Sequence, residues 1–218
     1  MDLIKAMQDR HSVRSYTDKP IEGEVCDKLK QIIAECNAQS GLNVQLVLNE
    51  PDAFDCFMAH YGKFSGVKNY VALIGKKGED EKIGYYGEKI ALYSQALGLN
   101  TCWVMMSYKK VKTAFKVEKG EKIYCVLAIG YGTTQGVQHK SRAVSEVSKG
   151  YENAPQWFKD GVNAALLAPT AMNQQKFKFN YLDGKVTAKG GGFCSLIDLG
   201  IAKLHFELGS GKAESEWN

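Results

Sequence analysis

The chain has 218 residues, of which 44% are hydrophobic and 24% are charged, and its formal net charge is +4. This is the composition of an ordinary globular protein, and the length allows one domain or two small ones. The charge is too mild for a dedicated nucleic-acid binder, although it suits binding of a phosphorylated small molecule. No apolar window predicts a signal peptide or a membrane span.

The elements expected in the first 148 residues follow from the spacing of apolar residues. The run at 123–129 is continuously apolar and predicts a central strand covered on both faces. Gly98 follows a predicted helix at the position of a C-terminal cap. The predicted elements are helices from Asp2 (with Leu3, Ile4 and Met7 on one face), from about Glu24 and over 83–97, strands at 44–48, 71–74 and 123–129, a short buried connection at 101–105, and a short helix after Ser107.

The last third of the chain returns to helix and strand patterns. Pro155 favours a helix start, and apolar residues continue from it at helical spacing. Residues 177–181 alternate between apolar and polar side chains, and Asp183-Gly184 predicts a tight hairpin turn into a second strand. We interpret Gly190–Gly192 as a flexible loop and not as a dinucleotide fingerprint, because no clear helix is predicted after it.

A weak internal repeat links the two parts of the chain. A hydroxyl residue, an asparagine and a glutamine occur at equal offsets in two helix-to-strand turns, at 40–45 and at 170–175. Two such matches in the same local context favour halves related by duplication.

Arginine is rare in this chain, since only three of its 28 cationic side chains are arginine. Arg10 and Arg14 lie in one short segment, and Arg142 follows the most apolar strand candidate. Arginine binds phosphate through a planar fork and lysine through a point charge, so these are candidate anion-binding positions. The alternative is a codon bias that leaves three arginines on a solvated surface.

The six cysteines are scattered without a Cys-x-x-Cys pair, and the four histidines show no metal-ligand spacing. We therefore expect a cytoplasmic protein with no disulfide framework and no metal site.

Four motifs occur in a fixed order. Residues 10–14 read Arg-His-Ser-Val-Arg, 97–103 read Leu-Gly-Leu-Asn-Thr-Cys-Trp, 126–131 read Val-Leu-Ala-Ile-Gly-Tyr, and 168–175 read Ala-Pro-Thr-Ala-Met-Asn-Gln-Gln. In these motifs the chain resembles the nitroreductase family of FMN-dependent oxidoreductases, and it looks closest to the branch whose C-terminal part echoes the N-terminal part. It departs from the family pattern at Asn100, where the family has glycine, at 176–177, where Lys-Phe replaces Pro-Trp, and at 40–45, where Ala-Pro is lost.

The resemblance implies an α+β fold of the nitroreductase type, with a central, mostly antiparallel sheet flanked by helices and with pseudo-duplicated halves. Residues 1–148 would form the FMN-binding half, and residues 149–218 would repeat the helix-turn-strand unit and complete the flavin site. The assembly would be a single-chain pseudo-dimer or a homodimer.

The resemblance also implies non-covalent binding of FMN. Arg10 and Ser12 would bind the phosphate, with Arg142 and Lys140 on its other side. Arg14 would be a fixed cation that stabilises reduced flavin, its alternative being a structural salt bridge. The expected cofactor-binding residues are Arg10, His11, Ser12, Arg14, Lys140, Arg142, Pro169, Thr170, Asn173 and Gln175.

Several other residues have ordinary structural alternatives. Turn chemistry is the alternative role of Thr170 and Asn173. Cys102 and Trp103 are interpreted as core packing. Weaker candidates for flavin contact are Asn43, Gln45, Lys63, Lys68 and Asn69.

The implied reaction is hydride transfer from NAD(P)H through flavin N5 to a nitroaromatic, quinone or similar acceptor. The cofactor carries this chemistry, so no catalytic side chain is expected. An FMN-binding carrier or redox sensor would share every contact, and a structural protein without flavin is a third alternative. The physiological acceptor and the choice between NADH and NADPH stay open.

Overall fold

The computed structural model describes residues 1–216, which fall into two compact units. Unit 1 consists of Met1, Asp9–Glu79 and Ile90–Gln138, and unit 2 consists of Asp2–Gln8, Asp80–Lys89 and the described residues from His139 onward. The predicted division between residues 148 and 149 stays a prediction. Among the helices described, none is both long and apolar enough to cross a bilayer.

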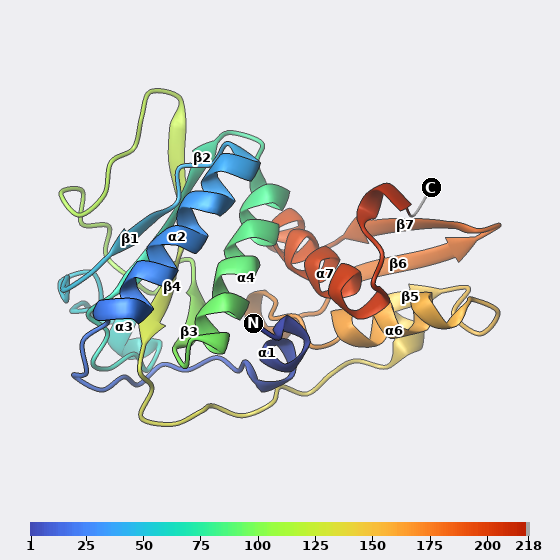
Figure 1. Cartoon of the computed structure of the whole chain (residues 1–218), viewed down its shortest axis with the longest axis horizontal. Coiled ribbons are helices and arrows are strands. Elements are labelled where there is room, and N and C mark those ends of the chain that lie inside the picture. Colours follow the sequence, from blue (N-terminus) through green and yellow to red (C-terminus); the bar gives the residue numbers. More distant parts are fainter. Residues whose placement is uncertain (217–218) are drawn as a thin grey trace. The chain divides into compact units, whose positions relative to one another are not determined.

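Unit 1 is built on a four-stranded antiparallel sheet in the order β1-β2-β4-β3 (Figure 1). Its strands are β1 (Gln45–Val47), β2 (Tyr70–Lys76), β3 (Asn100–Val104) and β4 (Glu121–Gly130). β4 pairs on both sides and is buried from Tyr124 onward, which confirms the prediction of a covered central strand. The interpretation of 101–105 as a connection is wrong, because these residues lie mainly in β3, where Cys102 pairs with Ala128 of β4.

The helices of unit 1 are α2 (Gly23–Ser40), α3 (Phe57–Tyr61) and the C-terminal part of α4 (Asp80–Ala96). The apolar residues of α2 are buried at the predicted spacing, and Gly98 ends α4 with a φ of 81°. The predicted helix after Ser107 is wrong, because residues 105–120 form bends and turns. Three apolar residues cover only one turn, which is too little packing to offset the cost of helix nucleation.

Unit 2 combines helices with a three-stranded sheet in the order β5-β6-β7. Its elements are α1 (Leu3–Asp9), the first part of α4, α5 (Val144–Val147), β5 (Ser148–Lys149), α6 (Gln156–Ala165), β6 (Phe177–Leu182), β7 (Lys185–Gly190), α7 (Ser195–Ser210), and 3-10 turns at Ala171–Asn173 and Glu214–Glu216. The Asp183-Gly184 hairpin has φ values of 50° and 81°, which confirms the predicted turn.

Two expectations for unit 2 are wrong. Gly190–Gly192 is followed by a helix, α7, whose residues Ile197–Phe206 are all buried. A helix that is buried on every side has no single apolar stripe, so the pattern did not reveal it. In α1, Ile4 is 50% exposed, and the buried face consists of Ala6 and Met7 instead.

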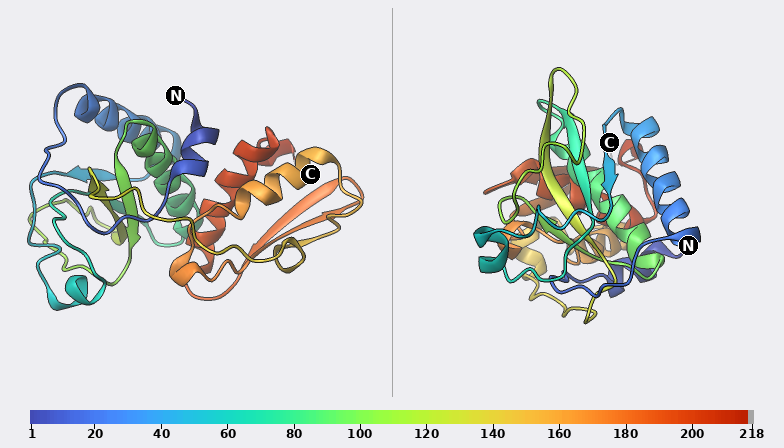
Figure 2. Two further views of the ribbon diagram at one scale, coloured as in Figure 1. Left: turned by 90° about the horizontal axis from the view of Figure 1, so that it is seen from below. Right: turned by 90° about the vertical axis from the view of Figure 1, so that its left-hand side faces the viewer.

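Close backbone contacts join the helices of unit 2. A Cβ atom at Gly84 of α4 would lie 2.0 Å from the Ile197 carbonyl oxygen, and one at Gly200 of α7 would lie 2.0 Å from the Glu81 carbonyl oxygen. Only glycine allows the two helices to cross at this distance. The Phe206 ring of α7 stacks on Phe179 of β6 at a centroid distance of 4.5 Å, and Figure 2 shows α6 and α7 side by side.

Candidate functional site

The arginine motif of unit 1 runs along the edge of the sheet beside β3. Ser12 bridges to Thr101 in parallel, and the Val13 amide donates to the Thr101 carbonyl at 3.1 Å. Val13 and Tyr16 are buried and anchor the segment, so the residues between them are held by the core. Arg10 is only 3% exposed, whereas Arg14 is exposed.

The Cys102 thiol shows how the motif side chains converge. Burial raises the pKa of Cys102, while the charges of Arg14 and Arg10 and a hydrogen bond with Ser12 act in the opposite direction. The thiol is therefore protonated, and the predicted interpretation of Cys102 as a buried core residue agrees with its 1% exposure. Two of the predicted FMN ligands, Arg10 and Arg14, thus act on this thiol through their positive charge, and a third, Ser12, is hydrogen-bonded to it.

Arg14 and the partly buried His11 occupy different surroundings. The Arg14 guanidinium lies 5.8 Å from the centroid of the Phe64 ring, at cation–π distance. A Cβ atom at Gly136 would lie 2.8 Å from the His11 Cβ, so the 131–138 loop passes close to His11. Gly136 has a φ of 72°, which permits this approach.

Asn100 is a positioning residue that the sequence interpretation missed. Its side-chain oxygen accepts from the Gly132 amide at 2.9 Å, and its Nδ2 donates to Gln135 Oε1 at 2.9 Å. The signal was present, because the family motif has glycine where this chain has Asn100. The Asn100 side chain therefore links the turn after β4 to the start of β3 through two hydrogen bonds.

The weaker candidates before β2 have protein partners. Lys68 Nζ donates to Asp18 at 2.6 Å, and the Asn69 side-chain oxygen accepts from the Asn49 amide at 3.0 Å. Lys63 is exposed with a φ of 61°.

In unit 2, the turn at 168–175 has an unusual backbone. Met172, Asn173 and Gln175 have φ values of 53°, 52° and 45°. Asparagine tolerates this left-handed region, but for methionine and glutamine it costs roughly 1–3 kcal/mol each. The backbone amide of Gln175 donates to Thr170 Oγ1 at 2.9 Å, which closes the turn.

Gln175 connects this turn to Lys140 and Arg142. Its Nε2 donates to the Lys140 carbonyl and to Asn173 Oδ1, each at 2.8 Å, and its Oε1 accepts from the Arg142 amide at 2.9 Å. Asn173 Nδ2 also donates to the Lys140 carbonyl at 2.9 Å. We call this arrangement of Asn173 and Gln175 on Lys140 and Arg142 the amide clamp of unit 2.

The backbone of Arg142 is held by the amide clamp, and its side chain is exposed. Its Nε donates to the Gln174 carbonyl at 2.9 Å, and its guanidinium pairs with Glu146 at 2.6 Å. The Ala143 amide and Arg142 both hydrogen-bond Glu146 and lower the pKa of its carboxyl. Lys140 is exposed next to Arg142, so this segment presents two cations.

Asp198 is a second residue that sequence reasoning missed. It is buried in the first turn of α7 and accepts from the Ala171 amide at 3.0 Å and from Gln174 Nε2 at 2.8 Å. Burial raises the pKa of the Asp198 carboxyl, although both hydrogen bonds act against that shift. No sequence signal could have identified it, because α7 itself was not predicted.

Unit 1 contains a second amide clamp with a similar bonding pattern, which closes on one residue, Lys116, where the clamp of unit 2 closes on two. Gln45 Nε2 donates to Asn43 Oδ1 at 3.0 Å and to the Lys116 carbonyl at 2.6 Å, and Gln45 Oε1 accepts from the Lys116 amide at 2.9 Å. Asn43 Nδ2 donates to the same Lys116 carbonyl at 3.2 Å. The sequence repeat therefore corresponds to a repeated hydrogen-bond geometry, one copy in each unit.

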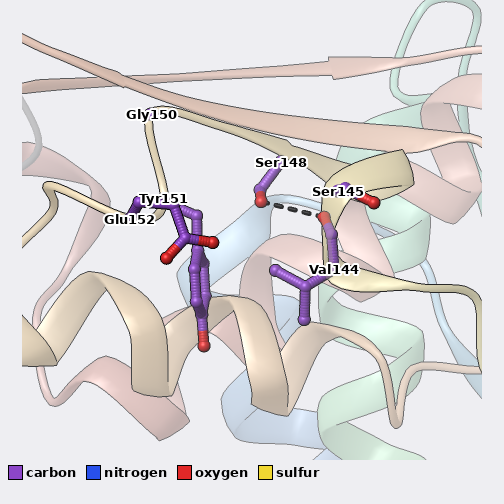
Figure 3. Close-up of a pocket in the computed structure, with 6 residues that line it drawn as sticks. All are labelled: Val144, Ser145, Ser148, Gly150, Tyr151 and Glu152. Atoms are coloured by element: carbon purple, nitrogen blue, oxygen red, sulfur yellow. Dashed lines mark hydrogen bonds between the residues drawn. The ribbon is translucent and has the colours of Figure 1, made fainter.

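A shallow pocket in unit 2 lies at the turn after α5 (Figure 3). It is lined by Val144, Ser145, Ser148, Gly150, Tyr151 and Glu152. Ser148 Oγ donates to the Val144 carbonyl at 2.9 Å inside it. None of the predicted FMN ligands lines this pocket, and no cluster of metal-ligating side chains occurs in residues 1–216.

The structure thus groups the predicted residues within each unit. Unit 1 brings together Arg10, Ser12 and Arg14 around Cys102, with His11 beside the 131–138 loop. Unit 2 brings together Lys140, Arg142, Thr170, Asn173 and Gln175 through hydrogen bonds, and Pro169 precedes Thr170 in the same turn.

A family model described as "Putative TM nitroreductase" matches residues 2–210. The chain belongs to this family. The match spans both units and all four motifs, and it confirms the resemblance and the α+β, nitroreductase-like fold expected from the sequence. No curated protein matches the chain.

Solved structures share the fold of this family member. A nitroreductase-family protein from Thermotoga maritima is 24% identical, with a TM-score of 0.69 over 95% of this chain and 83% of that chain. A protein from Desulfovibrio desulfuricans, described as a nitroreductase in complex with FMN, is 17% identical, with a TM-score of 0.51 over 67% and 94% of the two chains. An NADH dehydrogenase/NAD(P)H nitroreductase from Parabacteroides distasonis, so described, is 17% identical, with a TM-score of 0.52 over 67% and 96%.

Proposed function

We propose that the chain is an FMN-dependent oxidoreductase that uses NAD(P)H to reduce a nitroaromatic, quinone or similar small acceptor. The observation that carries this proposal is the grouping of rare arginines with hydrogen-bonding residues in both units of a nitroreductase-family chain. Bound FMN supplies two-electron transfer at its N5 atom, so the protein contributes binding, orientation and electrostatics.

The donor set fits a phosphorylated flavin. In unit 1, Arg10 and Ser12 offer charge-assisted donors of the kind that a phosphate of charge near −2 requires, and in unit 2 Lys140 and Arg142 offer such donors as well. Each such bond is worth roughly 1.5–3 kcal/mol, so two or three account for much of a micromolar affinity of about −8 kcal/mol.

The remaining predicted residues have narrower proposed roles. Arg14, exposed and fixed at its backbone, would stabilise the negative charge of reduced flavin. Thr170, Pro169 and Asn173 would line the flavin from the strained turn, and His11 would border it in unit 1. Asn43 and Gln45 are assigned no flavin contact, because a carboxylate is part of their hydrogen-bond network: Asn43 Nδ2 donates to Glu121 at 2.8 Å.

The test is the visible spectrum of the purified protein, followed by turnover. We expect flavin absorbance, release of FMN on denaturation with one FMN per chain, and steady-state oxidation of NADH or NADPH with menadione or a nitroaromatic. A colourless protein that binds no added FMN would reject the proposal. Stoichiometric FMN without turnover would favour the carrier or redox-sensor alternative.

A further inference from the structure

We propose that Gln175 is a positioning residue for the FMN phosphate site: it holds the Lys140–Arg142 backbone and does not touch the flavin. This inference rests on the proposed function, since it concerns the same cofactor. It differs from the expectation of the sequence analysis, in which Gln175 was a direct ligand.

The side-chain amide of Gln175 makes three hydrogen bonds within the protein. Its side chain is 2% exposed, both Nε2 hydrogens are donated to Lys140 and Asn173, and Oε1 accepts from the Arg142 amide. A primary amide has two hydrogens to donate and a carbonyl oxygen with two lone pairs. Both hydrogens and one lone pair are already used, and the residue is buried, so a flavin could accept a hydrogen bond from this amide only by displacing an existing bond.

The amide clamp of unit 2 holds alternate residues of the 139–142 segment. His139 and Ser141 are held on one side through the Leu166 carbonyl, at 2.9 and 3.3 Å. Between and after them, Lys140 and Arg142 are held through Gln175. Gln175 thus fixes the main chain at the two residues whose side chains are cationic and exposed, and loss of the clamp would loosen those residues while His139 and Ser141 stay attached.

The amide clamp of unit 1 provides a comparison that separates an effect on positioning from an effect on protein stability. Gln45 makes similar bonds in unit 1, but it holds the carbonyl and the amide of one residue, Lys116, whose side chain pairs with Glu118 at 2.7 Å. The asparagine of this clamp also donates to the Glu121 carboxylate at 2.8 Å, so a carboxylate is bonded to the clamp itself. The two glutamines thus bind backbone in a similar way, and only Gln175 holds an arginine.

The experiment compares Gln175→Met with Gln45→Met, because methionine keeps the length of glutamine and makes no amide hydrogen bonds. Dissociation constants are measured for FMN and for riboflavin, which has the same ring and no phosphate. We expect Gln175→Met to reduce the preference for FMN over riboflavin by about tenfold, equivalent to about 1.4 kcal/mol. Riboflavin affinity should be unchanged in both variants, and Gln45→Met should keep the wild-type preference.

A double-mutant cycle gives the sharper readout. If Gln175 acts through the cations of Lys140 and Arg142, Gln175→Met should change the FMN preference little in a Lys140→Gln/Arg142→Gln background, although it changes that preference in the wild-type chain. Equal weakening of FMN and riboflavin by Gln175→Met would instead indicate a ring contact and overturn the proposal, as would an unchanged preference. If Gln175→Met does not fold, Gln175→Leu serves the same test, since it removes the same hydrogen bonds and adds no charge that would act on the phosphate directly. A wild-type chain that binds no FMN would reject the proposed function, which is a different outcome.

Discussion

The guanidinium of Arg142 is paired with the carboxylate of Glu146, one helical turn further along the chain, at 2.6 Å. Glu146 also accepts from the Ala143 amide at 3.0 Å, so it caps α5 while it holds the arginine. A phosphate that binds Arg142 must compete with this carboxylate. The pair is solvent-exposed, so the competition is modest.

We therefore expect Glu146→Gln to tighten FMN binding by roughly two- to fivefold, since exposed pairs of this kind contribute up to about 1 kcal/mol. Glutamine keeps an acceptor for the Ala143 amide, so α5 should persist. Titration of the apoprotein with FMN measures the change, and riboflavin is the control ligand that should show none. Weaker FMN binding in this variant would mean that Glu146 orients Arg142 and does not compete for it.

Arg14→Gln should lower the reduction potential of bound FMN while sparing the phosphate contacts, because reduced flavin loses a nearby positive charge. A loss of about 1.4 kcal/mol corresponds to about 30 mV for a two-electron couple. Potentiometry of the bound cofactor measures the shift. Lys19→Gln is the matched control, since Lys19 is another exposed cation over an aromatic ring, at 4.0 Å from the Tyr131 centroid. Potentials equal to wild type in both variants would assign Arg14 to structure.

Much of the fold was predictable where one physical signal dominates. α2 buries one stripe of a polar helix, β4 is apolar over residues 123–129, and Asp183-Gly184 adopts the positive φ values that such a pair favours. α7 was missed because burial on all sides removes the period that reveals a helix. The helix expected after Ser107 rested on too few apolar residues.

The site was predictable as a set of residues, but its bonding was not. The rarity of arginine located Arg142 and the motif at 168–175 located Gln175, which are 33 residues apart in the chain. Nothing in the sequence indicates that the Gln175 amide is donated to a backbone carbonyl and not to a ligand, because glutamine can do either. Asp198 acts on the same turn from a helix whose existence the sequence did not show.

Met172→Gly should stabilise the protein by up to about 1 kcal/mol, because glycine adopts the left-handed region without the steric cost that a Cβ atom incurs. Met172 has a φ of 53° and is 83% exposed, so little burial is lost with its side chain. Met106→Gly is the control, since Met106 is also exposed and lacks a positive φ. That change should destabilise the protein slightly through the added freedom of the unfolded chain. Urea unfolding measures both, and equal destabilisation by the two changes would contradict the assignment of strain to the turn.

The pH dependence of stability should change in the Asp198→Asn variant. Burial raises the folded-state pKa of Asp198 above its ordinary value of 3.8, so the native state binds this proton more tightly than the unfolded chain does. Wild-type stability therefore loses a contribution as the pH rises from 3.8 through the folded-state pKa, and the loss is complete above it. The substituted amide cannot ionise, and its oxygen can still accept from the Ala171 amide.

We expect the free energy of unfolding of Asp198→Asn to increase relative to wild type as the pH rises through this window. Urea unfolding of both proteins between about pH 4 and pH 7 tests this, because other titrating groups cancel in the difference. A difference that moves in the opposite direction would show that the hydrogen bonds from Ala171 and Gln174 outweigh burial and stabilise the ionised carboxylate.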